Sequence, residues 1–264
     1  MLFICSQNYE KLLYKILAKT LFLGKELVYM PSCHSTNDMA LQRINKPDTR
    51  EGVIFITDNQ TQGKGQRGNQ WKSETNSNLT FSIVVKPSFL NASDQFYLNI
   101  IASLAVQSVL EKHIEGHIVK VKWPNDILLN NRKITGILIE NTLNGNFIQW
   151  SVLGFGLNVN QKSIEFAKAT SIYQETQTTS DLQLILEDLI GALELYYLKL
   201  KSGKKDDLKS EYLQHLFGYR ELRKYRSEYE FEGEVEDITA SGKLILRTNK
   251  GLQQFDFKEV EFLY

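Results

Sequence analysis

The sequence predicts an α+β fold in which a mixed sheet with flanking helices is followed by a small C-terminal β-barrel. Two helical stripes, within residues 94–110 and 180–200, are separated by several strand-like runs. No helical stripe follows Arg220, where short apolar runs alternate with glycines instead. The 264 residues are enough to bury a large core. We therefore expect one large domain over residues 1–217 and a small barrel over residues 218–264.

The N-terminal segment predicts one short amphipathic helix from Tyr9 to Leu23. Charged residues interrupt its apolar runs, so no stretch reaches the roughly 20 apolar residues that a membrane helix needs. A single helix leaves no room for a helix-turn-helix domain, and we expect no binding to an operator sequence.

A second helix is expected over residues 39–44, because Ser35-Thr36-Asn37-Asp38 precedes an apolar run and offers capping side chains. The first turn of such a helix presents backbone N–H groups that can also bind an incoming ligand. An ordinary N-cap without a binding role explains the same residues, and both interpretations stay open at this point.

The most informative segment runs from Gly63 to Trp71 and reads GKGQRGNQW. Three glycines expose backbone N–H groups beside two cations, which is typical of an anion-binding loop. The spacing also satisfies the dinucleotide motif G-x-G-x-x-G. However, strand-like runs at residues 53–57 and 79–85 flank the loop, and no helix follows it directly. The P-loop motif is absent as well. The sequence therefore predicts a strand-loop-strand unit that holds an anion.

The two longer helices are predicted by apolar residues that recur about every 3.6 positions. The first spans Asp94 to Leu110 after a cap candidate at Ser93, and the second spans Ser180 to Leu200. Strand-like runs between them cover residues 118–121, 126–129, 134–140 and 147–158. The C-terminal barrel is predicted from further runs at residues 229–235, 243–248, 252–257 and 260–263.

Charge and cysteine content argue against several classes of protein. The chain has 31 Lys and Arg residues and 31 Asp and Glu residues, and this balance argues against a nucleic-acid-binding protein. Its two cysteines, Cys5 and Cys33, form no C-x-x-C motif, and no His or Cys residues stand at metal-ligand spacing. We expect neither a zinc site nor a disulfide framework, and a cytoplasmic location.

Four further segments carry residue types that are common in binding sites. They are Ser35-Thr36-Asn37, Lys122-Trp123-Pro124-Asn125-Asp126, residues 132–140 and residues 154–160. In the second segment, Pro fixes the backbone while Lys, Asn and Asp offer a donor, an amide and a Mg²⁺ ligand; a polar turn is the alternative. Gly154 and Gly156 indicate either a close approach of backbone to a ligand or a β-bulge.

Together with the glycine loop, these segments resemble, in order and spacing, the catalytic core of biotin protein ligases, which attach biotin to a lysine of carboxylase carrier domains. The resemblance covers about residues 28–160, and the later helix and the barrel fit the family's helix and SH3-like domain. It implies a biotin/lipoate ligase-like catalytic domain that uses ATP, Mg²⁺ and biotin. The implied reaction passes through biotinyl-5′-AMP, and the implied partner is a biotin carboxyl carrier domain.

The resemblance also implies roles for individual residues. Biotin contacts are implied for a set of small, polar and cationic residues: Ser35, Thr36, Asn37, Gln60, Gly63, Lys64, Gly65, Gln66, Lys133, Gly154 and Gly156. Contacts with ATP are implied for Arg67, Trp71, Lys122, Asn125, Asp126 and Asn158, and Asp126 is also the implied metal ligand. Lys133, Arg67 and Lys64 are the implied catalytic cations, which offset the charge that grows on phosphorus.

The chain departs from many family members at Lys64 and Gln66, where they carry arginine, so its loop holds less fixed positive charge. The nearest alternative function is a lipoate or octanoate ligase or transferase, whose pocket would be an apolar tunnel without the Ser-Thr-Asn and Gln set. A non-catalytic biotin or nucleotide sensor is an alternative from another class. Acidic residues argue against a barrel that binds nucleic acid. A monomer and a homodimer through edge strands both fit the resemblance.

Overall fold

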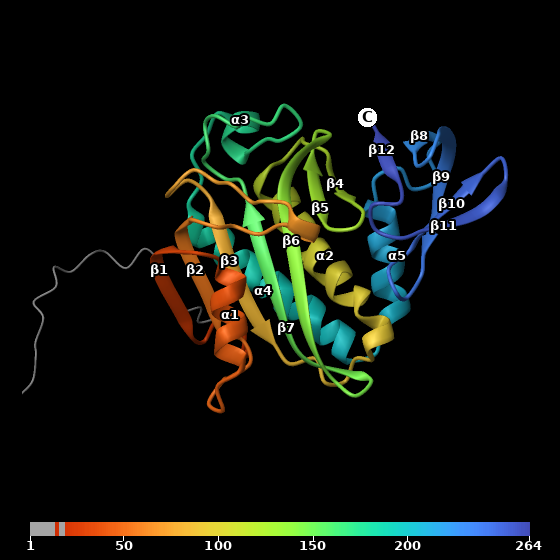
Figure 1. Ribbon diagram of the computed structural model, residues 1–264. Coiled ribbons are helices and arrows are strands. Elements are labelled where there is room, and N and C mark those ends of the chain that lie inside the picture. Colours follow the sequence, from red (N-terminus) through yellow and green to blue (C-terminus); the bar gives the residue numbers. More distant parts are fainter. Residues whose placement is uncertain (1–13, 16–18) are drawn as a thin grey trace, which may run out of the picture.

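The computed structural model describes Tyr14, Lys15 and residues 19–264 (Figure 1). Its large sheet has the strand order β1-β2-β3-β7-β6-β5-β4. The strand bounds are β1 Leu27–Cys33, β2 Ile54–Gln60, β3 Leu79–Val85, β4 Val119–Lys122, β5 Asp126–Leu129, β6 Arg132–Asn144 and β7 Phe147–Leu157. Strand β1 pairs with β2 in parallel, and the remaining neighbours pair antiparallel. The predicted mixed sheet is confirmed.

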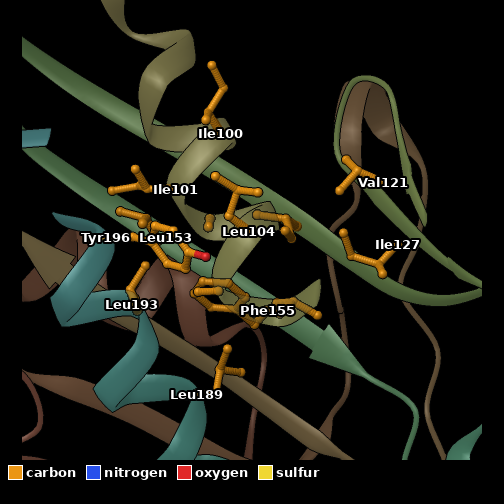
Figure 2. Packing of buried hydrophobic residues seen from close by; sticks show 14 of the residues in the cluster. Ile100, Ile101, Leu104, Val121, Ile127, Leu153, Phe155, Leu189, Leu193 and Tyr196 are labelled. Carbon is orange, nitrogen blue, oxygen red and sulfur yellow. The ribbon is translucent and has the colours of Figure 1, made fainter. Parts of the chain in front are cut away.

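Helices lie on both faces of this sheet (Figure 1). Helix α1 (Thr36–Ile44) covers a small apolar cluster on one face. Helices α2 (Phe96–His113) and α4 (Leu182–Lys201) cover the other face, where the main core lies. Figure 2 shows Leu104 of α2, Leu193 of α4 and Phe155 of β7 meeting in this core. Both helices lie where the periodicity of their apolar residues predicts them.

Alternation along the strands decides which residues face which layer. Phe81 of β3 and Phe155 of β7 are paired in register, and their rings stack at 4.9 Å within the main core. Their neighbours Ser82 and Gly154 therefore face the α1 side, because successive side chains of a strand point to opposite faces. Small residues on that face leave space beneath the start of α1.

The predicted start of α2 is wrong in its detail. Ser93 lies inside a short 3₁₀ turn, η2 (Ala92–Asp94), and Gln95 occupies the N-cap position without a side-chain cap. The N–H groups of Asp94 and Gln95 are already bonded to the carbonyls of Asn91 and Ala92, so the turn replaces a serine cap. Three further short helical elements are η1 (Gln66–Gly68), α3 (Ile172–Thr176) and α5 (Lys205–His215).

The predicted helix from Tyr9 to Leu23 lies mostly outside the described residues, and its described end is not helical. Residues 19–23 form bends and a turn. The backbone N–H groups of Leu21, Phe22 and Leu23 all donate to the buried carboxylate of Glu194 on α4, at 2.6, 2.8 and 2.9 Å. Because one carboxylate takes three successive donors, these residues cannot make the i→i−4 bonds of a helix.

The C-terminal part forms a five-stranded antiparallel sheet in the order β11-β10-β9-β8-β12. Its strands are β8 Arg223–Arg226, β9 Glu230–Ile238, β10 Leu244–Thr248, β11 Gly251–Phe255 and β12 Glu261–Leu263. The predicted α+β class with a small SH3-like C-terminal unit is thus confirmed, while a boundary at residue 218 stays a prediction. Among the residues that the structure describes, no helix is long and apolar enough to cross a membrane.

Candidate functional site

The site is a cavity of about 220 Å³ on the α1 face of the large sheet. Its floor is formed by β6 and β7, and its walls are formed by the start of α1, the end of β2, the glycine loop and the β4–β5 turn. The lining residues are Ser35, Thr36, Asn37, Gln60, Lys64, Gly65, Gln66, Asn69, Gln70, Trp71, Thr80, Asn125, Asp126, Lys133, Gly136, Ile137, Leu138, Gly154, Phe155, Gly156 and Lys258. The cavity brings together most of the residues that the sequence suggested.

A fixed set of uncharged polar groups lies at the start of α1. Gln60 Oε1 accepts from the backbone N–H of Thr36 at 2.7 Å and lies 3.2 Å from its hydroxyl. The hydroxyl of Ser82 lies 2.7 Å from Thr36 Oγ1 and 2.6 Å from Asn37 Oδ1. Asn37 in turn donates to Glu140 at 2.7 Å. Such a network holds donors and acceptors in fixed positions, which suits a ligand with its own paired amide-like groups.

Ser35 occupies the N-cap position of α1 with extended backbone, but its side chain makes no cap hydrogen bond. The predicted helix is therefore present, whereas the expected side-chain cap is not. Ser35 is buried and lines the cavity.

Two glycines of the large sheet leave room for the Trp71 indole to pack directly on it. Gly136 of β6 and Gly156 of β7 are register partners. A Cβ atom at Gly156 would overlap the indole, and one at Gly136 would lie 3.2 Å from it. The indole N–H is buried and has no hydrogen-bond partner among the residues that the structure describes. A buried donor of this kind is normally satisfied, so it marks a place where a ligand acceptor fits.

A partly exposed ion pair lies beside the indole. Lys133 Nζ lies 2.6 Å from Asp126 Oδ1 and 5.9 Å from the centre of the Trp71 ring. The neighbouring Asn125 donates from its side chain to the carbonyl of Ile137 at 2.6 Å. Asp126 of β5 is the register partner of Gly136, and Lys133 of β6 is the partner of Leu128. The two residues thus lie on adjacent strands, and the long lysine side chain reaches the carboxylate.

The glycine loop closes on itself above the cavity. Gly65 donates to Asn69 and Trp71 donates to Gly63 through the backbone, at 2.7 and 2.9 Å. Lys64 Nζ lies 2.5 Å from Asp38 Oδ1 at the first turn of α1. This hydrogen bond to Asp38 raises the pKa of the Lys64 ammonium, which therefore stays charged at neutral pH.

Some predicted site residues lie outside this cavity. Lys122 lies over the ring of Tyr264 at 5.1 Å, and the buried amide of Asn158 donates to the carbonyl of Thr170. Gly63 borders an adjoining groove outside the loop. The side chain of Arg67 lies outside the described part of the chain. The roles expected for these four residues stay predictions.

Sequence reasoning missed residues that reach the site only through strand pairing. Ser82 stands in an apolar run of β3, and a serine amid buried residues was the available signal. Gly136 and Glu140 lie on β6, within the segment 132–140 that the sequence singled out, but neither was assigned a role there. Lys258 enters the cavity from the C-terminal sheet. In the described part of the chain, no group of three or more His, Cys, Asp and Glu residues could hold a metal ion.

Two protein-family models match the chain. Residues 29–158 match the biotin/lipoate A/B protein ligase family, and residues 226–263 match the biotin protein ligase C-terminal domain. The first match covers every residue of the cavity lining except Lys258, and the second match contains Lys258.

Relatives and solved structures point the same way. The chain is 27% identical over 250 residues to the bifunctional ligase/repressor BirA of Bacillus subtilis, covering 92% of this chain and 76% of the relative. It is 28% identical to a biotin–[acetyl-CoA-carboxylase] ligase of Paracoccus denitrificans, covering 86% and 97%. A biotin protein ligase from Aquifex aeolicus in complex with biotin and ATP superposes with a TM-score of 0.74 at 25% identity, covering 90% and 99%.

Proposed function

The chain belongs to the biotin protein ligase family, and from that premise we propose that it activates biotin with ATP and transfers the biotinyl group to a lysine of a biotin carboxyl carrier domain. One observation carries the proposal. The fixed uncharged set of Thr36, Asn37 and Gln60 shares one cavity with the Lys133–Asp126 pair.

The uncharged set suits the ureido ring of biotin. That ring presents two N–H donors and one carbonyl acceptor in a plane, and it needs complementary groups in fixed positions. Thr36 and Asn37 are held by Ser82, Gln60 and Glu140, so they are positioned before the ligand arrives. Preorganised polar groups lose little entropy when they bind, which favours affinity.

The charged pair suits the activation of a carboxylate. The carboxylate of biotin attacks the α-phosphate of ATP, pyrophosphate leaves and the acyl-adenylate forms. Two anions must approach, so Lys133 lowers the barrier by offsetting the negative charge that builds up on phosphorus. The amine of the acceptor lysine then attacks the acyl carbon, and AMP leaves with the bonding electrons. Neither step requires a covalent enzyme nucleophile.

A magnesium ion fits this donor set when it arrives with the nucleotide. Asp126 is the one carboxylate among the cavity-lining residues that the structure describes. One or two protein carboxylates and several phosphate oxygens are the usual ligands of Mg²⁺ in such sites, and the ion neutralises phosphate charge. Asp126 also holds Lys133, so it positions the ammonium that faces the substrate carboxylate.

Trp71 supports the nucleotide side of the proposal. Its ring lies on Gly136 and Gly156 and offers a flat apolar surface next to Lys133. Adenine can pack on such a surface, and the unpartnered indole N–H offers a donor to a phosphate or ribose oxygen.

The test is pyrophosphate release with MgATP and biotin, lipoate or octanoate offered separately. A biotin carboxyl carrier domain is then added to each mixture and analysed by mass spectrometry. We expect release with biotin and a single biotinylated lysine on the acceptor. Release with lipoate or octanoate instead would move the chain to the sister activity, and biotin binding without release would identify a sensor.

A further inference from the structure

Lys133 lies at a point where the large sheet holds its backbone incompletely. It is the second residue of β6, and the pairing of β6 with β7 begins two residues later, at Thr135. The register between β6 and β5 shifts at Ile134, which is the extra residue of a β-bulge. Bulges bend a strand and re-aim its side chains. The direction of the Lys133 side chain therefore depends on what else holds its backbone.

Residues 168–170 supply the pairing that β7 does not give. The backbone N–H of Lys133 donates to the carbonyl of Lys168 at 2.8 Å, and the N–H of Thr170 donates to the carbonyl of Lys133 at 2.8 Å. This segment runs parallel to β6 through a bridge between Lys133 and Ala169. Thr170 is buried, so water does not compete for its bond. Both backbone groups of Lys133 are thus held by one loop.

Glu175 of α3 joins this loop to the start of β6. Its Oε1 accepts from the Thr170 hydroxyl at 2.6 Å and from Arg132 Nη2 at 2.5 Å. Its Oε2 accepts from the side-chain amide of Asn130 at 2.9 Å. Thr170 bonds to the backbone of Lys133, and Arg132 precedes Lys133 in the chain. A single carboxylate therefore holds both segments that meet at Lys133.

The Glu175 carboxylate is buried and charged. Its side chain is only 8% exposed. Burial by itself would raise the pKa of this carboxyl, but hydrogen bonds from Thr170 and Asn130 and the charge of Arg132 lower it overall. A buried charge is costly unless its partners are all in place. Glu175 therefore favours a single arrangement of the residues around it.

The position of the Lys133 ammonium has to be set at both ends of a flexible side chain. Asp126 lies 2.6 Å from Nζ at one end, and the loop 168–170 holds the backbone at the other. A displacement of about 1 Å in a reacting site can lower a rate roughly 100-fold. The backbone of Lys133 is therefore as important for its chemistry as the ion pair at its tip.

We propose that Glu175 is a positioning residue for Lys133. Through Thr170 and Arg132 it fixes the backbone from which the Lys133 ammonium reaches the biotin carboxylate and the α-phosphate. This inference rests on the proposed function. Glu175 is not among the residues that line the cavity, so it acts through Lys133 and not on the substrate. Helix α3 and the loop before it thereby become part of the machinery that forms the adenylate.

The experiment is a double-mutant cycle of Glu175→Gln with Lys133→Gln, measured as single-turnover formation of the adenylate. Glutamine keeps the size of the side chain but loses the charge and one acceptor oxygen. Glu175→Gln should lower the rate roughly tenfold and leave KM for biotin unchanged. In the Lys133→Gln background the same change should cost less than about twofold, because the group that Glu175 positions is already gone.

Asp188→Asn is the matched control. Asp188 is likewise paired with side chains of another element, Lys112 and His113, but it joins α4 to α2 away from the cavity. Its variant should form the adenylate at the wild-type rate. The proposal would be overturned by a wild-type rate in Glu175→Gln. An equal fold-loss with and without Lys133 would overturn it as well, since that is the result of a purely structural role.

Thr170→Val tests the same connection if Glu175→Gln does not fold. Valine keeps the shape of threonine and the backbone bond to Lys133, and it removes the hydroxyl that donates to Glu175. We expect a loss of rate of roughly threefold, which again should vanish in the Lys133→Gln background. An unchanged rate in Thr170→Val would contradict the proposed path.

Acetylation of lysines by acetic anhydride, followed at each site by mass spectrometry, reports on Lys133 without turnover. Glu175→Gln should release the ammonium from Asp126 and raise the rate of acetylation at Lys133 at least about threefold, with Lys120 as the unchanged reference. Equal rates at Lys133 in both proteins would overturn the inference. Absence of biotin-dependent adenylate formation in the wild-type protein would count against the proposed function instead, so the two failures are distinguishable.

Discussion

At the scale of single residues, the site depends on small side chains that face α1. Ser82, Gly154 and Leu138 lie in one register row across β3, β7 and β6, and Thr80, Gly156 and Gly136 lie in the next. The glycines of these rows allow Asn37 and Trp71 to lie directly on the sheet. The two faces of β7 therefore differ in role. Gly154 and Gly156 leave space on the α1 face, and Phe155 between them packs into the core on the other face.

Gly154→Ala should therefore damage biotin binding more than stability. The new methyl group would overlap the side-chain amide of Asn37 and displace it from Ser82 and Glu140. We expect KM for biotin to rise at least roughly tenfold, measured by biotin-dependent pyrophosphate exchange. Gly191→Ala on α4 is the matched control, because a Cβ there meets no atom within 4 Å and a helical alanine stabilises by about 0.5–1 kcal/mol. Equal KM values for biotin in both variants would contradict this assignment.

Lys133→Gln should lower the rate of adenylate formation roughly 10²–10³-fold, as the removal of a group that stabilises transition-state charge commonly does. The amide keeps much of the side-chain bulk, but it cannot replace the charge that faces Asp126 and the substrate. Lys120→Gln on β4, two strands away in the same sheet, is the control, since Lys120 does not line the cavity. Single-turnover formation of the adenylate is the measurement. A rate within about threefold of wild type would show that Lys133 has only a packing role.

Most of the site could be predicted from the sequence at the level of residue type, and some of it could not. Ser35, Thr36 and Asn37 stand together in the chain, and the glycine loop is contiguous, so both are visible without a structure. Ser82, Glu140 and Gly136 reach the site through strand register, which single-sequence patterns do not encode. Lys258 depends on how two sheets pack, which is further still from local sequence.

At the scale of elements, apolar residues that recur with a clear period or form a continuous run predicted helices and strands correctly. Segments that mix apolar and polar residues without such a pattern did not. Helices α2 and α4 and strands β3 and β5 lie where the apolar residues place them. Strand β1 contains Pro31 and Ser32, and β8 reads Arg-Lys-Tyr-Arg, so neither has an apolar run that marks it as a strand. Both were missed for that reason. The turns and bends at residues 19–23 were missed because Glu194, which holds them, stands about 170 positions away.

Glu194→Gln should loosen the connection between the N-terminal segment and α4. A glutamine offers one acceptor oxygen and an NH₂ group that cannot accept, so at least one of the buried N–H groups of Leu21, Phe22 and Leu23 loses its partner. We expect the free energy of unfolding to fall by about 2–4 kcal/mol, measured by urea denaturation. Glu115→Gln at an exposed position is the control. A loss no larger than that of the control would mean that the segment 21–23 adds little to stability.

At the scale of the whole molecule, the two sheets are joined next to the β4–β5 turn, which lines the cavity. The indole N–H of Trp123 donates to the carbonyl of Gly242 at 2.8 Å, and this bond is buried. A Cβ at Gly242 would overlap the ring of Phe96 on α2, so the β9–β10 turn packs tightly on the large domain. Phe257 contacts both Phe96 and Trp123. A change at this junction should therefore reach Asn125, Asp126 and Lys258 together.

Trp123→Phe tests this coupling because it keeps an aromatic ring for Phe257, removes the donor to Gly242 and replaces the indole by a smaller ring. The orphaned buried carbonyl should lower the free energy of unfolding by about 1–3 kcal/mol. Because the altered ring moves the Phe257–Lys258 turn, KM for ATP should rise while KM for biotin stays at its wild-type value.

Trp150→Phe, on β7 outside the cavity, controls for the loss of an indole elsewhere in the same sheet. A parallel rise in both KM values would indicate general loosening, and an unchanged KM for ATP would show that the junction supports the fold without setting the nucleotide site. The predicted split between the two substrates rests on the proposed function, in which biotin binds at the start of α1 and ATP binds beside the β4–β5 turn.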